Sequence, residues 1–253
     1  MTTQALTLPT VPQQAKKIWR NQKFLMIGAP GIGKSEFWAQ GDKTLFIDTE
    51  GNVEHLNIMS MKCRSWEDFI EIGSLLIQSS NTDKFPYDTI VIDTLDKWAD
   101  YASEEIIDRA KVKYAKALSS GLEINTIGDI PEGNGWFGWK GLINNYLEKL
   151  AKLPCAIVLI GHTQTKRIED TVKKYDKNTI NIGGQLGVLL LGWANHIMNV
   201  EANYSGTKIN RIVYSRPSQS REAKSHGATI PDQWTWTDDM KSNFGKLKTL
   251  FTD

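Results

Sequence analysis

The sequence has few cysteines and no long hydrophobic run. Cys63 and Cys155 are its only cysteines and form no C-x-x-C pair, which excludes a disulfide scaffold; we expect two buried free thiols, with one structural disulfide as the alternative. The longest apolar stretches, residues 155–161 and 187–194, are far shorter than the roughly 20 residues that span a bilayer. Residues 1–20 contain no apolar run typical of a signal peptide. We therefore expect a cytoplasmic protein with no membrane partner.

The chain also lacks a large net charge. Its 30 Lys and Arg residues balance 29 Asp and Glu residues, for a formal charge of +1. This balance argues against a protein that coats nucleic acid non-specifically. The charged residues are nevertheless segregated along the chain. Residues 42–109 carry an excess of Asp and Glu, and residues 161–226 carry an excess of Lys and Arg. One face of the fold can therefore be basic although the total is near zero.

No internal repeat or low-complexity tract divides the chain. Its 253 residues, of which 40% are hydrophobic and 23% charged, are typical of a globular protein with one large domain or at most two small ones. Residues 1–15 contain two prolines and little periodicity, so we expect a flexible N-terminal arm. Residues 16–253 are expected to form a single domain.

Short apolar runs alternate with segments of helical periodicity. Strands are predicted over residues 23–28, 44–48, 88–93 and 156–161. Helices are predicted over residues 33–40, 65–76, 94–117, 139–153 and 185–194, with a small helix after Pro231. Residues 196–204 and 208–215 predict a hairpin, and residues 119–137 and 163–184 predict long loops. This order indicates an α/β fold with a mostly parallel sheet and an antiparallel hairpin at one edge.

One glycine-rich motif follows the first predicted strand. Residues 28–35 read GAPGIGKS and match the P-loop pattern G-x-x-x-x-G-K-[ST] between a strand and a helix. The glycines let successive N–H groups point at an anion, the lysine reaches the β- and γ-phosphates, and the serine hydroxyl binds Mg²⁺. We expect a nucleoside triphosphate and Mg²⁺ to be held by Gly28, Ala29, Pro30, Gly31, Ile32, Gly33, Lys34, Ser35 and Glu36.

Two acidic residues at strand ends are expected to complete this site. Asp93 ends the third predicted strand and is expected to hold Mg²⁺ with Ser35, the alternative being an ordinary turn residue. Hydrolysis also needs a group that orients water. Many AAA+ ATPases place a glutamate directly after the strand-end aspartate, but Thr94 stands there. Glu50, after a strand expected beside the P-loop strand, is the candidate base; alternatively, Asp48 and Glu50 only cap a turn.

The order of these motifs resembles a known family. The chain contains GAPGIGKS, FIDTEGN, YDTIVIDTLDKW, VLIGHTQTK and a late SREAKSHGATIPDQW. Over residues 20–240 it resembles the phage-encoded RecA-like P-loop ATPases of the single-strand annealing and recombination group, which are nucleotide-binding AAA-domain proteins. The resemblance implies ATP hydrolysis with Lys34 and Glu50 as catalytic residues. It also implies that His162, or else Gln164, contacts the γ-phosphate and passes the nucleotide state to the following segment.

The same resemblance implies partners. It indicates assembly into rings or filaments, action on single-stranded DNA with a single-strand binding protein as a further partner, and the cytoplasm of a bacterial host. In such assemblies a cation from a neighbouring subunit completes the site, for which Arg221 and Lys224 are candidates. The alternatives for both are contact with DNA phosphate or plain surface.

The segment after His162 has the composition of a DNA contact. Basic side chains with an interleaved aromatic suit a single-stranded backbone and a stacked base. The candidates are Lys166, Arg167, Lys173, Lys174, Tyr175 and Lys177. Acidic residues among them leave an ordinary solvated loop as the alternative. Trp136, Phe137 and Trp139 are core residues by default, or else a surface for a partner or DNA.

Three functions therefore remain open from the sequence. The first is a RecA-like ATPase that acts on single-stranded DNA. The second is a nucleotide-dependent ATPase for protein assembly with no role on DNA. The third is a P-loop kinase for a small molecule, in which the segment 163–184 would serve as a lid.

Overall fold

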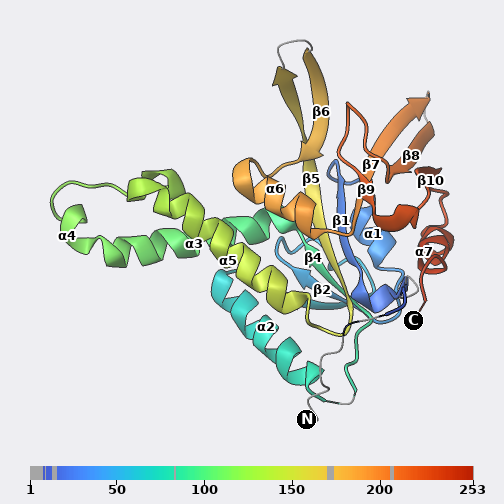
Figure 1. Ribbon diagram of the computed structural model, residues 1–253, viewed down its shortest axis with the longest axis horizontal. Helices are drawn as coiled ribbons and strands as arrows, with labels where there is room; N and C mark the ends of the chain where they lie inside the picture. The colour runs from blue at the N-terminus through green and yellow to red at the C-terminus, as the bar shows by residue number, and fades with distance from the viewer. Residues whose placement is uncertain are drawn as a thin grey trace.

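A computed structural model describes residues 8, 10–12, 16–82, 84–169, 174–205 and 208–252. Most of the predicted arm over residues 1–15 therefore lies outside the described residues. Within the described chain, a single sheet forms the centre and helices cover its two faces, while three helices extend far to one side (Figure 1).

The described residues form a ten-stranded sheet in the order β10-β8-β7-β1-β5-β4-β2-β3, with β6 paired to β5 and β9 to β7. The strands are β1 (Lys23–Gly28), β2 (Thr44–Asp48), β3 (Met59–Lys62), β4 (Thr89–Asp93), β5 (Ala156–Glu169), β6 (Lys174–Ile180), β7 (His196–Ser205), β8 (Lys208–Tyr214), β9 (Lys224–Ser225) and β10 (Gln233–Thr235). Strands β3, β2, β4, β5, β1 and β7 run parallel, and β8 returns antiparallel to β7. The predicted α/β class and antiparallel hairpin are confirmed.

The helices connect these strands. They are α1 (Lys34–Trp38), α2 (Trp66–Ser80), α3 (Leu95–Lys113), α4 (Ala115–Leu118), α5 (Asn134–Leu150), α6 (Gly184–Trp193) and α7 (Met240–Lys248). Short 3-10 turns occur at Trp19–Asn21, Ile127–Asp129, Pro131–Gly133 and His226–Ala228. Two helices begin at hydroxyl caps: the Ser65 side chain accepts from the Asp68 amide before α2, and the Thr94 side chain accepts from the Lys97 amide before α3.

The central strands are buried on both faces. Along β1, Leu25 and Ile27 face the cluster under α2, α3, α5 and α6, whereas Phe24 and Met26 face the cluster under α1 and α7. Side chains alternate between the faces of a strand, so two covered faces require an apolar residue at every position. This explains why these strands are visible in the sequence as uninterrupted apolar runs.

Three predictions about the strands are wrong. Residues 163–184 are not a loop, because β5 continues to Glu169 and pairs antiparallel with β6. This hairpin projects from the core, and its side chains are polar apart from Ile168, Tyr175 and Ile180, so its hydrophobic signal is weak. The exposed strand β3 was not predicted for the same reason. The strand β2 does not lie beside β1, since β5 and β4 stand between them.

The predicted boundaries in the middle of the chain also need correction. Helix α3 ends at Lys113 rather than at residue 117, and α5 begins at Asn134 rather than at residue 139. The segment between them, predicted as a loop, contains two 3-10 turns. Ile124 and Ile130 of this segment pack with Ala110 of α3 in a small cluster that is separate from the main core.

Both cysteines are free and buried, as predicted. Burial raises the pKa of the Cys63 and Cys155 thiols to about 12 each, so neither is a nucleophile near neutral pH. Within the described residues, no helix combines the length and the apolar character needed to cross a membrane.

The buried His196, at the start of β7, predicts acid sensitivity of the fold. Its residue is 1% exposed, and its ring stacks on Phe24 at 5.2 Å. Burial lowers its pKa from 6.5 to about 4, with nearby cations contributing. The unfolded chain binds this proton at a higher pH, so the free energy of unfolding should fall by about 3 kcal/mol between pH 6.5 and pH 4.

Urea unfolding at several pH values measures this loss. The variant His196→Gln should lose less stability over the same pH range, whereas the exposed control His55→Gln should follow the wild type. Identical pH profiles for wild type and His196→Gln would refute the assignment.

Candidate active site

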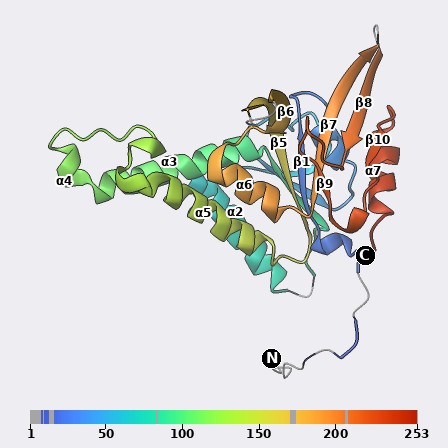
Figure 2. The ribbon, with the colours of Figure 1, turned by 45° about the horizontal axis from the view of Figure 1, so that its top comes forward.

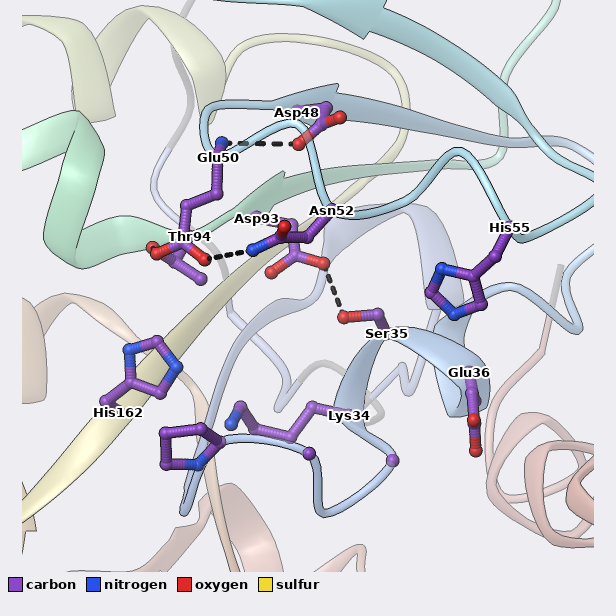
Figure 3. A pocket seen from close by; sticks show the side chains of 13 residues that line it. Lys34, Ser35, Glu36, Asp48, Glu50, Asn52, His55, Asp93, Thr94 and His162 are labelled. Atoms are coloured by element: carbon purple, nitrogen blue, oxygen red, sulfur yellow. Dashed lines mark hydrogen bonds between the residues drawn. The ribbon is translucent and has the colours of Figure 1, made fainter.

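A hollow of about 220 Å³ lies where the carboxyl ends of β1, β2 and β4 and the middle of β5 meet the start of α1 (Figure 3). It is lined by Pro30, Gly31, Gly33, Lys34, Ser35, Glu36, Asp48, Glu50, Asn52, His55, Asp93, Thr94 and His162. The structure therefore brings together six of the nine predicted P-loop residues, the two predicted strand-end acids and the predicted sensor. Gly28, Ala29 and Ile32 do not line the hollow, and Ile32 packs into the core cluster under α1 and α7. Ligands of open α/β sheets bind at this edge of the sheet.

The P-loop needs glycine for its backbone conformation and for close packing. Gly31 and Gly33 have φ angles of +71° and +97°, a region that residues with side chains rarely adopt. Gly33 then caps the start of α1. At Gly28, a Cβ atom would lie 2.8 Å from the backbone oxygen of Val200 on β7. The curled loop is therefore possible only with these residue types.

Lys34 is a buried cation at the base of this loop. Its residue is 6% exposed, and its Nζ donates hydrogen bonds of 2.9 Å each to the carbonyl oxygens of Gly28 and Ala29. Burial lowers the pKa of Lys34 to about 8, although the carboxylates of Asp93, Asp96 and Glu50 act in the opposite direction. The ammonium group is thus held by neutral carbonyls in a desolvated place, where a phosphate would be a stronger partner.

Ser35 and Asp93 place two oxygen atoms together. The Ser35 hydroxyl donates a 2.5 Å hydrogen bond to Asp93 Oδ2, which joins α1 to the end of β4. Burial raises the pKa of Asp93 to about 6, while the Ser35 hydrogen bond and the Lys34 charge lower it. The carboxylate is therefore a buried anion near an incompletely compensating cation.

This pair fits Mg²⁺ by its chemistry. Mg²⁺ prefers oxygen ligands and binds through one or two protein oxygens together with waters and substrate phosphates. Across the described residues, no group of three or more His, Cys, Asp or Glu side chains is placed to hold a metal by itself. Ser35 and Asp93 are the residues that would hold a magnesium ion shared with a triphosphate.

Glu50 is held in one orientation toward the hollow. Its Oε1 accepts a 2.7 Å hydrogen bond from the Thr94 hydroxyl, and its Oε2 accepts a 3.0 Å bond from Asn52 Nδ2 (Figure 3). Asp48 has a different task, because its Oδ1 accepts from the backbone amides of Glu50 and Gly51. Asp48 therefore caps the turn, while the Glu50 carboxylate remains directed at the site.

His162 lies on β5 opposite the P-loop glycine that ends β1, since Gly28 and His162 are register partners. Its Nδ1 is 3.3 Å from Asp96 Oδ2, and its backbone amide donates to the same oxygen at 2.9 Å. Asp96, in the first turn of α3, therefore orients the ring toward the hollow.

The sequence analysis did not identify four residues that lie in or beside this site: Asn52, His55, Thr94 and Asp96. Thr94 was noted only as the residue that stands where a glutamate was sought, yet its hydroxyl both caps α3 and holds Glu50. The largely polar run TLDKW, which directly follows β4, was the sequence feature that could have indicated Thr94 and Asp96. No local pattern marked Asn52 or His55.

Arg221 and Lys224 do not line the hollow, and both have partners within their own chain. The Arg221 guanidinium forms two hydrogen bonds to the Glu201 carboxylate, of 3.0 and 3.1 Å, and lies 3.7 Å from the centre of the Tyr214 ring. Lys224 Nζ donates to the carbonyl oxygens of Leu191, Gly192 and Ala194 at the end of α6. A role in a neighbouring subunit's site would require these contacts to break.

The predicted DNA residues lie on the β5–β6 hairpin, except that Lys173 is outside the described residues. Lys166, Tyr175 and Lys177 share one face, which borders a hollow of about 210 Å³ against α6. We call this hollow the hairpin groove. On the opposite face, Arg167 pairs with Asp176 at 3.0 Å and Lys174 with Glu169 at 3.5 Å. The fold thus places Lys166, Tyr175 and Lys177 on the groove face, where Lys177 pairs with Glu222 at 2.6 Å, and Arg167 and Lys174 on the opposite face.

Comparison with known proteins finds a relative of prophage origin. The chain is 23% identical over 158 residues to the SPbeta prophage-derived uncharacterized protein YorG of Bacillus subtilis (strain 168), which covers 60% of this chain and 44% of that protein. The chain thus spans less than half the length of this curated relative.

Two solved structures are similar at 10% identity. They are the KaiC-like protein PH0186 of Pyrococcus horikoshii OT3, with a TM-score of 0.46 over 88% of each chain, and the flagellar accessory protein FlaH of Methanocaldococcus jannaschii, with a TM-score of 0.44 over 87% of this chain and 86% of that one. A family model described as an AAA domain matches residues 20–226. This match covers most of the chain, including the P-loop, Glu50, Asp93 and His162, and the chain therefore belongs to this family of AAA-domain proteins.

Proposed function

We propose that this protein hydrolyses ATP with Mg²⁺ and couples hydrolysis to single-stranded DNA in phage-type recombination or annealing. The observation that carries the ATPase part is the convergence of three groups in one hollow: the P-loop with Lys34, the Ser35–Asp93 pair, and Glu50. Each supplies a different requirement of phosphoryl transfer, namely phosphate binding, metal binding and orientation of water.

The chain's own residues divide the chemistry as follows. Lys34 exchanges its two carbonyl partners for phosphate oxygens, and its charge offsets the charge that develops on the transferred group. A magnesium ion held by Ser35 and Asp93 would add to this neutralisation. The Glu50 carboxylate, fixed by Thr94 and Asn52, accepts a hydrogen bond from the attacking water and orients it. His162, oriented by Asp96, meets the γ-phosphate side of the hollow.

The DNA part of the proposal rests on β5. This strand carries His162 in the nucleotide hollow and continues without interruption into the hairpin, so that one element joins the two places. In the hairpin groove, Lys166 offers charge to a phosphate backbone and Tyr175 offers a ring for base stacking, whereas Lys177 is already paired with Glu222 at 2.6 Å. A shift of the strand upon γ-phosphate binding would move this groove.

The kinase alternative has less support. The segment considered as its lid is a hairpin held by strand pairing from Thr163↔Ile180 to Glu169↔Lys174, and Glu50 has a clear task in hydrolysis. An ATPase for protein assembly shares the same nucleotide site and differs only in the partner. Within the proposal, a neighbouring copy supplies Arg221 or Lys224 to complete the site.

ATP turnover with and without single-stranded DNA tests the proposed function. We expect release of inorganic phosphate that rises when single-stranded DNA is added. Turnover that ignores DNA and rises with a protein partner would favour the assembly ATPase, and transfer of the phosphoryl group to a small molecule would favour the kinase.

Removing the P-loop cation should strongly weaken nucleotide binding. In Lys34→Ala the triphosphate loses its buried ammonium partner, so we expect affinity for ATP to fall by about 10- to 100-fold or more, as for a lost charged hydrogen bond. Titration with a fluorescent ATP analogue in the presence of Mg²⁺ measures this. The exposed control Lys43→Ala should bind normally, and normal binding by Lys34→Ala would exclude this residue from the site.

Changing the proposed base should separate binding from hydrolysis. The variant Glu50→Gln keeps the hydrogen-bonding shape but loses the carboxylate charge, so we expect unchanged ATP affinity and turnover lowered by about 100-fold or more. Steady-state phosphate release measures this. Glu54→Gln, in the same loop but outside the hollow, is the matched control. An active Glu50→Gln enzyme would rule out the assignment.

The two faces of the hairpin should differ in DNA binding. Tyr175→Ala should weaken binding of single-stranded DNA by about 10-fold through lost stacking. Lys166→Ala should weaken it and reduce the salt dependence by about one phosphate contact. Fluorescence anisotropy in a salt series measures both. The control Arg167→Ala removes a cation already paired on the opposite face; an equal loss in that variant would refute the groove.

A further inference from the structure

His162 and Asp96 form a pair at the edge of the nucleotide hollow. His162 lies on β5 and Asp96 lies in the first turn of α3, and these two elements are in contact beside the hollow (Figures 1 and 2). The Asp96 Oδ2 atom is 3.3 Å from His162 Nδ1, a distance at which the two form an ion pair once the ring is protonated. The pair is mostly buried, with 23% of the His162 side chain and 18% of the Asp96 side chain exposed.

The second oxygen of Asp96 has no donor. Asp96 Oδ1 is buried and has no hydrogen-bond partner among the described residues. A buried carboxylate that is incompletely hydrogen-bonded is unfavourable unless a positive charge lies beside it. Lys34 interacts with Asp96 only at longer range, because its ammonium group is bonded to the carbonyl oxygens of Gly28 and Ala29. A protonated His162 ring would supply the missing charge directly.

The charged groups that face His162 are mostly acidic. They are Lys34 and Glu36 from α1, Asp48, Glu50 and His55 from β2 and the loop after it, and Asp93 and Asp96 from β4 and α3. The elements paired with β5 at this level bring no charge, since Gly28 of β1 lies opposite His162 and the Asn181 amide after β6 donates to its carbonyl oxygen. Lys34 is the one Lys or Arg among the described residues that line the hollow.

An anionic Mg·ATP complex in this hollow calls for a further positive charge. Arg221 and Lys224 would have to leave the partners that hold them within their own chain. Of the two imidazoles that line the hollow, His55 lies beside Glu36 at one end, whereas His162 lies on the side of the Lys34 ammonium group (Figure 3). Opposite charges nearby favour the protonated form of an imidazole. His162 is therefore the group that a γ-phosphate would charge.

We propose that ATP binding protonates His162, whose Nε2 then donates a hydrogen bond to the γ-phosphate while Asp96 holds Nδ1. The proton comes from solvent, and its charge offsets that of the γ-phosphate before and during transfer. His162 is thus a catalytic residue that is charged in the ATP complex, and Asp96 is its positioning residue. Because ADP has no γ-phosphate, the proton leaves after hydrolysis. The proposal rests on the ATPase function and adds one proton to its nucleotide cycle.

Isothermal titration calorimetry at pH 7, in two buffers of different ionisation enthalpy, measures the protons taken up on binding. The ligands are the slowly hydrolysed analogue ATPγS and ADP, each with Mg²⁺. Lys34, with a pKa of about 8, and Asp93, with a pKa of about 6, can also change protonation, but both meet ADP as well. We expect ATPγS to take up about 0.7 proton more than ADP, since a histidine in water is about one-quarter protonated at pH 7.

Variants assign this proton to the pair. His162→Gln should lose the difference between ATPγS and ADP, and Asp96→Asn should lose most of it. The matched controls are His55→Gln, which removes the other imidazole of the hollow, and Asp100→Asn, an exposed carboxylate one turn later on α3. Both controls should keep the difference.

The wild-type protein locates the proton without any substitution. Long-range ¹H–¹⁵N spectra of the imidazole nitrogens should show the His162 ring becoming protonated with ATPγS and not with ADP. Equal proton uptake with the two ligands, an unchanged His162 signal, or a difference lost in His55→Gln would overturn the proposal and leave the ATPase assignment intact. A protein that binds neither nucleotide would refute the proposed ATP site, and this proposal with it.

Discussion

The hydrogen bond between Ser35 and Asp93 holds the nucleotide site together. It connects the first turn of α1 to the end of β4 across the intervening strand β5, with Asp93 buried and Ser35 half-buried. Because burial disfavours an isolated carboxylate, Asp93 needs the hydroxyl and the nearby Lys34 charge. The P-loop, the two oxygens proposed to hold Mg²⁺ and the strand that separates them are thereby held in one geometry.

The same geometry places two neutral groups, one hydroxyl and one side-chain amide, next to the carboxylate of the proposed base. Thr94 follows Asp93 directly and donates to Glu50, and Asn52 donates from the other side. The carboxylate therefore comes from β2 and its orientation from β4 and the turn after β2. This differs from a site in which a glutamate follows the strand-end aspartate, but in the proposed mechanism it would meet the same requirement of a fixed acceptor for water.

Strand β5 connects the core sheet to the projecting hairpin. Its first half is buried between β1 and β4, and its second half leaves the core as part of the hairpin. The ion pair of Lys177 with Glu222, at 2.6 Å, ties this hairpin to the segment before β9. Helices α3, α4 and α5, which form an arm, follow β4 in the chain and project on another side of the sheet (Figure 1). Nucleotide site, hairpin groove and arm are thus three separate surfaces built on adjacent strands.

The sequence by itself determined the buried strands, the P-loop and the two strand-end acids. These features follow from local chemistry, since a strand covered on both faces must be apolar throughout, and a phosphate-binding turn requires glycine at Gly31 and Gly33. The exposed strands β3 and β6 lacked that signal, because their side chains bury little area. Their pairing depends on partners elsewhere in the chain.

Only the tertiary structure decided which distant side chains meet. The contact of Glu50 with Thr94 and that of His162 with Asp96 join segments 44 and 66 residues apart. The division of Lys166, Tyr175 and Lys177 from Arg167 and Lys174 follows from the register of β5 with β6. Strand register assigns each side chain to a face, and no local pattern in a polar hairpin specifies it.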